Sequence, residues 1–389
     1  MNATMENARA GVGVAQTGDT TLPRVWVLLG KGTGGNGQMV SLAKELGWPY
    51  KTKSLHYNRL NHCPNILLDR TCISLDDKQS DPLTPPWPDV VIAASRRSAP
   101  IARWIKQQSG GRTKLVHLLH TQAPLHWFDL IITTPQYGLP ELPNVLSITG
   151  PLNHVSSEAL AAAASHWATK LNSLPRPYTA LLVGGNSSTY RFDPKTAARL
   201  GKEANAHVRK TKGTLLISTS PRTPAASADA LFASLDCSAY CYRWRPHDSG
   251  NPYLAYLALA DHFIVTGDSA SLAIEACQMG KPVALFEWAQ RPAIRFFSKW
   301  FHHSLQSRSS LAHSGDKPIS VCSKSRSLVD GLIYWGFLKP PRDFSSYYQL
   351  LQAKGLITKL GEPAVPIPRQ PLHDMEQAVS RIRHVMGYE

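Results

Sequence analysis

The sequence lacks an apolar run of about 18 residues, the length that a membrane-spanning helix needs. It also lacks a Cys-x-x-Cys pair, so its six cysteines predict no zinc site and are typical of scattered thiols in a reducing compartment. Residues 1–23 have neither a basic start nor an adequate apolar stretch, which argues against a signal peptide and predicts a disordered tail. These absences favour a cytoplasmic protein.

Acidic residues are scarce, with 27 Asp and Glu against 42 Lys and Arg, which gives a net charge of +15. Such an excess favours anionic partners: nucleotides, nucleic acid or an acidic membrane surface. Because no basic–aromatic module of a known nucleic-acid-binding type is visible, nucleic acid is not expected as a partner. The shortage is also local, since no Asp or Glu occurs anywhere from 46 to 68.

That local shortage bears on the stretch VLLGKGTGGNGQ (27–38), which contains Gly30-x-Gly32-x-x-Gly35 directly after an apolar run. This is the pattern of a dinucleotide-binding turn, but an NAD site also needs Asp or Glu about 20 residues further on. The missing acid argues against NAD. The alternatives are a tight strand-to-helix turn and a loop that faces an acceptor across a cleft, with Gly32, Thr33, Asn36 and Gln38 as the candidate residues.

Apolar, β-branched runs alternate with helical patterns along the whole chain, which predicts an α/β fold with mainly parallel sheets. The series restarts after two prolines in 171–180, so two Rossmann-like domains are expected to face a cleft. The strands are predicted at 24–30, 88–95, 113–120, 128–134 and 144–150, then at 178–185, 213–219, 239–244, 262–267 and 282–287. The predicted domains are 24–174 (N-terminal, acceptor side), 175–325 (C-terminal, nucleotide-sugar side) and 326–389 (C-terminal helices packing back on the first domain).

A second glycine loop, LLVGGNSSTYRFD (181–193), opens the second domain. Gly-Gly followed by hydroxyl side chains after a strand suits phosphate binding through backbone amides, although no P-loop lysine follows. The next strand ends in Ser218 and reaches Arg222, which either neutralises a phosphate or stays solvated beside a helix start. The candidate residues of these two strand ends are Gly184, Gly185, Asn186, Ser187, Ser218 and Arg222.

The stretch IVTGDSASLAIEACQMGKPVALFE (264–287) predicts a strand, a turn and a helix. Ser269 and Ser271 fall at the helix start, where they can cap it and bind anions. Glu275 shares a face with Ser271 and lies in an apolar helix, so it needs a partner, and a ribose diol is a natural one. Lys281 is a further candidate cation. The candidate nucleotide-sugar residues of this stretch are Thr266, Gly267, Asp268, Ser269, Ser271 and Glu275.

Taken together, two α/β domains, each opened by a glycine loop, and a strand–Gly–helix–Glu–Gly–Lys–Pro unit resemble the GT-B glycosyltransferases. Over about 24–385 the chain is also similar to the mitochondrial-fission ("elongated mitochondria", ELM) family, as a bacterial-type member. The segments that carry this resemblance are ASRRSAPIARWIK (94–106), TGPLNHV (149–155), ALLVGGNSSTY (180–190), LLISTSPRTP (215–224), NPYLAYLALAD (251–261) and VTGDSASLAIEAC (265–277). The first glycine loop departs from the acidic loop of similar proteins.

The resemblance implies a nucleotide sugar in the second domain, with its diphosphate near Gly184, Gly185, Ser187 and Ser269 and its ribose on Glu275. The leading hypothesis is a metal-independent sugar transferase with a nucleoside-diphosphate sugar as donor, no tightly bound cofactor and an envelope or lipid-linked acceptor. The alternatives are a non-catalytic GT-B-like adaptor for a partner protein or membrane, and a nucleoside-diphosphate-sugar epimerase.

The acceptor hydroxyl of a transferase needs a base in the first domain, and His120, at the end of a strand, is the candidate. Arg96 and Arg97, at another strand end, either face an anionic acceptor or begin a solvated helix. Residues 291–303 predict a basic aromatic helix, which either packs on the sheet or lies on an anionic membrane surface. The second reading suits a protein that is peripheral at the inner face of the membrane.

Overall fold

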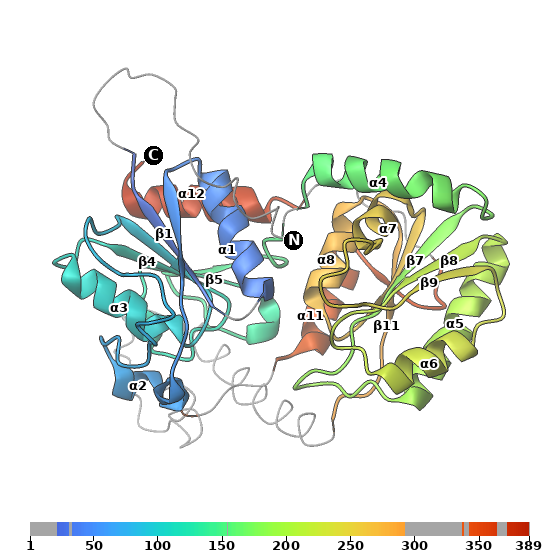
Figure 1. The fold of residues 1–389 in the computed structure, drawn as a ribbon, viewed down its shortest axis with the longest axis horizontal. Coiled ribbons are helices and arrows are strands. Elements are labelled where there is room, and N and C mark those ends of the chain that lie inside the picture. Colours follow the sequence, from blue (N-terminus) through green and yellow to red (C-terminus); the bar gives the residue numbers. More distant parts are fainter. Residues whose placement is uncertain are drawn as a thin grey trace, which may run out of the picture.

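The structure, a computed structural model, describes residues 22–30, 33–153, 155–291, 337, 342–363 and 372–388. It contains two α/β units side by side, one built around each of two six-stranded sheets (Figure 1). Every strand pairing in both sheets is parallel. The predicted α/β class with two Rossmann-like sheets is therefore confirmed.

The first sheet has the strand order β2-β1-β3-β4-β5-β6. Its central strands are continuous apolar runs because helices bury both faces: Val25 and Val27 belong to one core, Trp26 and Leu28 to the other. The strands are β1 (Val25–Leu29), β2 (Tyr50–Ser54), β3 (Val90–Ala93), β4 (Lys114–Leu118), β5 (Leu130–Thr133) and β6 (Val145–Ser147). The helices of this part are α1 (Thr33–Leu46), η1 (Arg59–His62), α2 (Asn65–Leu68), α3 (Ser98–Gln108), η2 (Leu125–Trp127) and η3 (Pro135–Tyr137).

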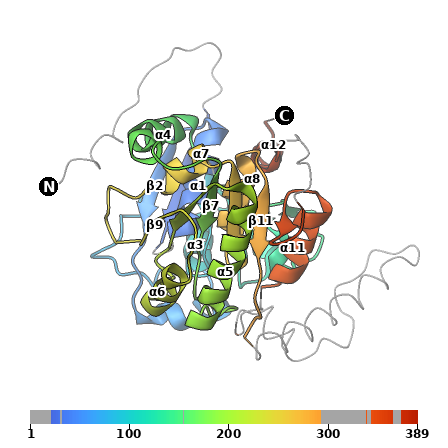
Figure 2. The same ribbon diagram turned by 90° about the vertical axis from the view of Figure 1, so that its right-hand side faces the viewer.

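The second sheet has the order β12-β11-β10-β7-β8-β9, which read from the other edge is the 3-2-1-4-5-6 order of the Rossmann fold. Figure 2 views this unit from the side that α5 and α6 cover. The strands are β7 (Tyr178–Leu182), β8 (Thr214–Ser218), β9 (Ala239–Tyr242), β10 (His262–Thr266), β11 (Val283–Phe286) and β12 (Thr358–Lys359). The helices are α4 (Ser157–Leu171), α5 (Pro194–Thr211), α6 (Ala225–Ala233), α7 (Tyr253–Leu259), α8 (Ala270–Gln278) and α11 (Phe344–Ala353).

The C-terminal helix α12 (Asp374–Met386) packs on the first unit, as predicted: Ala378, Val379 and Ile382 join the core that holds α1 (Figure 1). The Asp374 carboxylate accepts hydrogen bonds from the backbone N–H groups of Thr149 and Gly150, both at 2.8 Å. The other described C-terminal helix departs from the prediction that the C-terminal helices pack back on the first domain. α11 packs in the core of the second unit, where Tyr347 and Tyr348 are fully buried.

The first glycine stretch is a correction to the sequence-based expectation of a loop. Helix α1 begins at Thr33, so Gly34, Gly35 and Gly37 are helical residues. A Cβ at Gly35 would lie 3.5 Å from the Cβ of Ala94, an ordinary van der Waals contact, so α1 lies beside the end of β3 without requiring glycine there.

Several predicted segments lie outside the described residues. These are the tail as far as residue 21, Gly32, the basic aromatic helix at 291–303 apart from Arg291, and a helix expected near 325–336.

Candidate functional site

The carboxyl ends of β7 and β10 meet where the strand order of the second sheet reverses, which is where open α/β sheets bind their ligands. Gly184 and Gly185 follow β7, and Gly267 and Asp268 follow β10. Gly185 has φ +155°, and a Cβ there would lie 2.1 Å from the carbonyl oxygen of Arg222. Only glycine therefore fits this turn, and the predicted residues of the two strand ends do lie together.

The Asp268 carboxylate lies against the two glycines, because a Cβ at Gly184 would be 2.2 Å from its Oδ1. Its Oδ2 accepts hydrogen bonds from Gly185 N at 2.9 Å and from Arg222 Nη1 at 2.6 Å. Its Oδ1 accepts the Thr266 hydroxyl at 2.8 Å, and that hydroxyl oxygen accepts Gly184 N at 2.7 Å. The carboxylate thus takes the amide and guanidinium donors that were predicted for a phosphate.

Burial raises the pKa of Asp268, and the Arg222 ion pair together with the hydrogen bonds opposes that rise. The Asp268 side chain is fully buried, whereas the Arg222 side chain is 38% exposed. A buried carboxylate that loses its partner is costly, so Arg222 has a structural role as the partner of Asp268. The exposed part of its side chain can still meet a ligand.

Helix α8 starts at the same edge, and Ser269 is its N-cap residue, but the Ser269 side chain makes no capping hydrogen bond. The predicted capping role of Ser269 is therefore wrong. Ser271 lies in the first turn and is half-buried. The orphan N–H groups of a helix start and its positive dipole end favour an anion beside these two serines.

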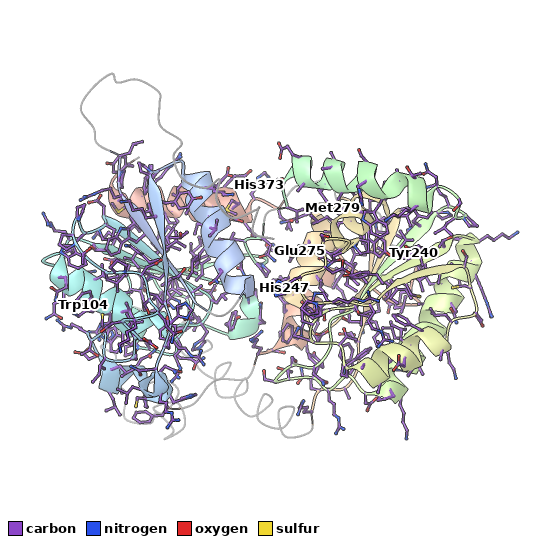
Figure 3. The ribbon with its side chains drawn as sticks, in the orientation of Figure 1. Trp104, Tyr240, His247, Glu275, Met279 and His373 are labelled. Atoms are coloured by element: carbon purple, nitrogen blue, oxygen red, sulfur yellow. The ribbon has the colours of Figure 1, made fainter. Side chains whose placement is uncertain are left out.

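Glu275, on the second turn of α8, has protein partners. Its Oε1 accepts the Asn153 amide at 2.7 Å, and its Oε2 accepts the Tyr253 hydroxyl. Burial raises the pKa of Glu275, and these two hydrogen bonds oppose the rise. Glu275 lies on the side of the second unit that faces the first (Figure 3), and Asn153 comes from the segment that joins the units. A ribose diol would have to share or replace these partners.

Four other predicted residues of the second unit are buried or have hydrogen-bond partners within the protein. Asn186 Oδ1 accepts Phe192 N at 2.9 Å, and Ser187 Oγ accepts Tyr190 N at 3.0 Å, so both side chains shape the loop after Gly185. Ser218 is buried at the end of β8. Lys281 is a correction: it precedes β11, at the amino edge of the sheet, and donates to Ala260 O at 2.6 Å. It therefore lies at the opposite sheet edge from the glycines.

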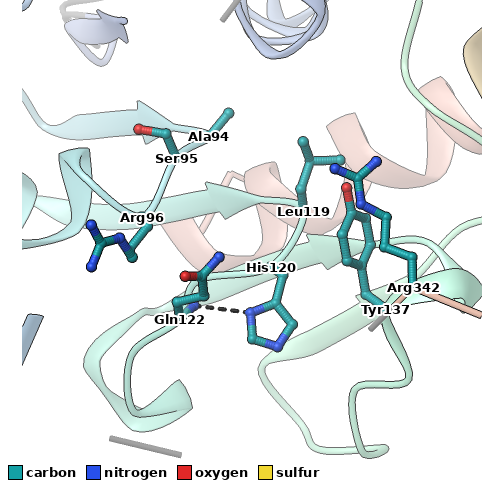
Figure 4. A pocket seen from close by; sticks show the side chains of 8 residues that line it. All are labelled: Ala94, Ser95, Arg96, Leu119, His120, Gln122, Tyr137 and Arg342. Atoms are coloured by element: carbon teal, nitrogen blue, oxygen red, sulfur yellow. Dashed lines mark hydrogen bonds between the residues drawn. The ribbon is translucent and has the colours of Figure 1, made fainter. Parts of the chain in front are cut away.

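A cavity of about 150 Å³ lies at the carboxyl edge of the first sheet (Figure 4). Its walls come from the ends of β3 and β4, from η3 and from the residue that leads into α11. The predicted residues Arg96 and His120 both line it. The lining residues are Ala94, Ser95, Arg96, Leu119, His120, Gln122, Tyr137 and Arg342.

The His120 ring has a defined orientation, because Nδ1 accepts the backbone N–H of Gln122 at 3.0 Å (Figure 4). The neutral ring then carries its proton on Nε2. His117 lies three residues earlier, in β4. Burial lowers the pKa of His117 to about 4, so His117 is neutral at pH 7. His117 Nε2 lies 3.3 Å from Ser95 O and fixes one wall of the cavity.

The other predicted acceptor-side residues do not line this cavity. Asn36 hydrogen-bonds Gly30 through both its amide nitrogen and its amide oxygen, and the buried Gln38 accepts Leu152 N at 3.2 Å. Arg97 lies 6.0 Å from the Tyr57 ring. Thr33 begins α1, and its side chain is outside the described part of the chain. Asn36 and Gln38 are thus structural residues, because their polar groups are used to hold α1.

Sequence reasoning missed Arg342, Gln122 and Tyr137 in the cavity, and Asn153 and Tyr253 beside Glu275. Asn153 and Tyr253 do fall in the family-like segments TGPLNHV and NPYLAYLALAD, where no role was assigned to them. Arg342 has no such signal, since it follows a Pro-Pro pair at the start of a helix that was not predicted.

Two absences concern the described residues alone. They contain no group of three or more His, Cys, Asp or Glu side chains that could hold a metal ion. No helix among them is long and apolar enough to cross a membrane.

Two parallel doubly wound sheets with glycine-lined strand ends place the chain in the class of two-domain, GT-B-like α/β proteins. Residues 33–322 match the family model described as mitochondrial fission ELM1, and the chain belongs to that family. An uncharacterized protein of Rickettsia prowazekii is 27% identical over 295 residues, which are 67% of this chain and 82% of that protein. The mitochondrial fission protein ELM1 of Arabidopsis thaliana is 30% identical over 220 residues, which are 50% of this chain and 51% of that protein.

Solved structures with a similar chain course include the S. aureus MnaA–UDP co-structure, with a TM-score of 0.42 and 10% identity over 95% of this chain and 98% of that chain. A UDP-glucosyltransferase from Polygonum tinctorium has a TM-score of 0.42 and 11% identity over 94% and 98% of the two chains. A UDP-GlcNAc 2-epimerase from Neisseria meningitidis has a TM-score of 0.41 and 11% sequence identity, over 85% of this chain and 99% of that chain. Likeness at this level assigns no ligand and no reaction to this chain.

Proposed function

We propose that this protein is a GT-B-like glycosyltransferase that moves a sugar from a nucleoside-diphosphate donor to an acceptor hydroxyl. The observation that supports this proposal is the strand-order reversal between β7 and β10, where the start of α8 and the partly exposed guanidinium of Arg222 lie at the same sheet edge. The orphan N–H groups of a helix N-terminus at such an edge suit the approach of a diphosphate. The donor therefore belongs to the second unit.

The donor's charge would be met by Arg222, whose guanidinium is partly exposed, and by the first turn of α8 with Ser271. Asp268 already occupies the amide of Gly185, so the diphosphate would bind on the exposed side of Arg222 rather than in contact with that amide. Glu275, one turn further along the helix, would accept hydroxyls of the ribose in place of its bond from Tyr253 or Asn153.

In the transfer, the acceptor oxygen forms a bond to the anomeric carbon as the bond from that carbon to the phosphate oxygen breaks. The diphosphate leaves with the electron pair, stabilised by Arg222 and the helix start. The acceptor proton goes to a base, for which His120 in the first-unit cavity is our candidate. Its Nδ1 accepts Gln122 N, so a base role at Nε2 requires that bond to break and the ring proton to move to Nδ1.

The net charge of +15 supports an anionic setting for the acceptor, and we place the reaction in the cytoplasm at the inner membrane face. The transfer is proposed to need no metal ion, because a guanidinium and a helix dipole would carry the leaving-group charge.

The proposal is tested by isothermal titration and thermal shift with UDP-, GDP-, ADP- and CMP-sugars and with NAD(P). One nucleoside diphosphate sugar should bind, and Glu275→Gln should weaken it about tenfold by removing a charged acceptor of ribose hydroxyls. Glu203→Gln, on the exposed face of α5, is the matched control and should bind like the wild type. Binding of no nucleotide would contradict the proposal in favour of an adaptor, and binding of NAD alone would contradict both.

A further inference from the structure

The cavity at the carboxyl edge of the first sheet has an unusual charge balance. Two of its lining residues are arginines, Arg96 and Arg342, and none of the described lining residues is acidic. Neither arginine forms an ion pair within the described part of the chain. Arg96 and Arg342 lie at opposite ends of the lining residues, and the Arg96 guanidinium points away from the others (Figure 4). A ligand in the cavity would therefore lie between two positively charged residues.

Arg96 is held by neutral groups, since its guanidinium donates to Asn61 O at 2.6 Å and to Cys63 O at 3.3 Å. Burial and the neighbouring charge of Arg97 lower the pKa of Arg96. Its charged form is thus held without a compensating carboxylate, and an anion in the cavity would relieve this cost.

Arg342 is the second cation, and it comes from the start of α11, whose buried face belongs to the second unit. Its guanidinium lies 5.6 Å from the centre of the Tyr137 ring. Its Nε is buried and makes no hydrogen bond to any described residue. Because Arg342 lines the cavity, its positive charge acts on any ligand there.

The neutral groups of the cavity are also able to donate. The His120 ring carries its proton on Nε2, because Nδ1 accepts Gln122 N. The side chains of Gln122 and Tyr137 add an amide and a hydroxyl donor, whereas the Ser95 hydroxyl already donates to Ser98 Oγ at 3.3 Å. The two guanidinium groups, the Gln122 amide and the Tyr137 hydroxyl offer more donors than the two oxygens of a carboxylate need, and they suit the larger number of oxygens on a phosphate.

The backbone around His120 is strained, which is a separate observation. Leu119 has φ +68° and Gln122 has φ +47°, in the left-handed region that favours glycine. Such strain is concentrated at binding and catalytic sites. It holds the His120 ring and the Gln122 side chain on the cavity wall.

We infer that this cavity binds a phosphate group, carried by the acceptor of the transfer. That the phosphate belongs to the acceptor rests on the proposed function, whereas phosphate binding rests on the cavity alone. The same chemistry occurs in a soluble phosphate ester and in a lipid whose headgroup is a phosphate, so both are compared in the test.

The test is titration calorimetry on the full chain with inorganic phosphate, glycerol 3-phosphate, glycerate and the short-chain lipid dihexanoyl phosphatidic acid. Phosphate compounds should bind, and glycerate, the carboxylate counterpart, should bind at least about tenfold more weakly. Tighter binding of the lipid than of glycerol 3-phosphate identifies a lipid-linked source, and the reverse order identifies a soluble one. The ring signals of His120 should shift in NMR spectra when phosphate is added.

Arg342→Gln should weaken phosphate binding about tenfold or more, and Arg342→Lys should fall between that variant and the wild type. Arg209→Gln removes the same charge from an exposed site on α5 and should not change binding. Phosphate binding that is equal in the Arg342→Gln and Arg209→Gln variants, or glycerate binding as tight as glycerol 3-phosphate, would overturn the inference, as would no binding of any phosphate compound.

The two proposals fail separately. Nucleotide-sugar binding that is lost while phosphate still shifts His120 removes the transferase and leaves the phosphate site. Nucleotide-sugar binding without a phosphate effect on His120 removes the phosphate site and leaves the transferase. Arg342→Gln should keep the wild-type affinity for the nucleotide sugar, which also shows that this variant is folded.

Discussion

At the residue scale, the polar groups of the second unit are arranged around two carboxylates with different neighbours. Asp268 is paired with the guanidinium of Arg222, whereas Glu275 has only the neutral partners Asn153 and Tyr253. A buried carboxylate without a cation favours its protonated form. The ionisation of Glu275 should therefore affect the stability of the fold.

We predict that Glu275→Gln removes a pH dependence of stability. Burial raises the pKa of Glu275 above its ordinary value of 4.5, so between these two pKa values the native state binds more protons than the unfolded state. The wild-type free energy of unfolding should then fall as the pH rises from 4.5 through the folded pKa. Glutamine mimics the protonated form and satisfies both neighbours. Urea unfolding of both proteins over this range measures the effect, and parallel curves would contradict it.

A second residue-scale prediction concerns Gln122, with φ +47°. Gln122→Gly should stabilise the protein by about 0.5–1 kcal/mol, because glycine adopts this conformation without strain. The same variant should weaken phosphate binding, since it removes an amide donor from the cavity. Lys212→Gly is the matched control: Lys212 has φ +54° at the end of α5, so stability should rise there without a change in phosphate affinity. Unchanged phosphate affinity in Gln122→Gly would show that the strained backbone at Gln122 does not contribute to phosphate binding.

At the element scale, the sequence predicts best those segments whose surroundings are uniform. Strands such as β7 and β10 are buried on both faces, so their apolar runs identify them. β2 was missed because it is an edge strand with the polar sequence YKTKS. α11 was missed because its aromatic residues and serines give a weak helical signal, and its place in the core depends on distant neighbours.

The same distinction between local and distant neighbours explains which site residues the sequence predicts. Strand ends identify which polar residues gather at the sheet edge, and Arg222, Asp268 and Glu275 are there. They do not show that Arg222 and Asp268, 46 residues apart, bind each other. Nor do they show that Arg342 reaches the cavity of His120, because that contact depends on how the units pack. Partner choice between distant side chains is a property of tertiary structure.

Helix α12 offers an element-scale prediction. Asp374→Ala should destabilise the protein by about 2–4 kcal/mol, because the buried N–H groups of Thr149 and Gly150 lose their acceptor. Glu376→Ala, two residues further along and paired with His373 at the surface, is the control and should stay within about 0.5 kcal/mol of the wild type. Urea unfolding followed by circular dichroism measures both. Equal values for the two variants would show that the carboxylate does not anchor the helix.

At the scale of the whole molecule, three contacts between described residues are among those that join the two units. Gly150, just after the first sheet, lies against Ile274 of α8, and a Cβ there would be 2.3 Å from its Cγ1. Lys354 of α11 donates to the Thr149 hydroxyl at 2.9 Å, and Asp343 N donates to Gln136 O at 2.9 Å. The segment 149–153 is therefore where packing in one unit meets packing in the other.

We predict that Gly150→Ala destabilises the protein by about 1–3 kcal/mol through this collision. Ile274→Ala makes room for the added methyl group, so the double variant should be less destabilised than the sum of the single ones by about 1 kcal/mol or more. Gly37→Ala is the control, because an added Cβ meets no atom within 4 Å and a helical alanine should stabilise by up to about 1 kcal/mol. Additive effects at Gly150 and Ile274 would mean that the contact does not couple the units.

The placement of α12 also affects how the protein is made. The bond between Asp374 and Thr149 joins residues 225 positions apart. At about 5–20 residues per second, roughly 10–45 s of translation separate the first sheet from the helix that covers it. During that interval the strands and helices of the second unit up to β11 can form, while the apolar faces of α1, β4 and β5 that α12 covers are still open. The unit that leaves the ribosome first is thus completed last.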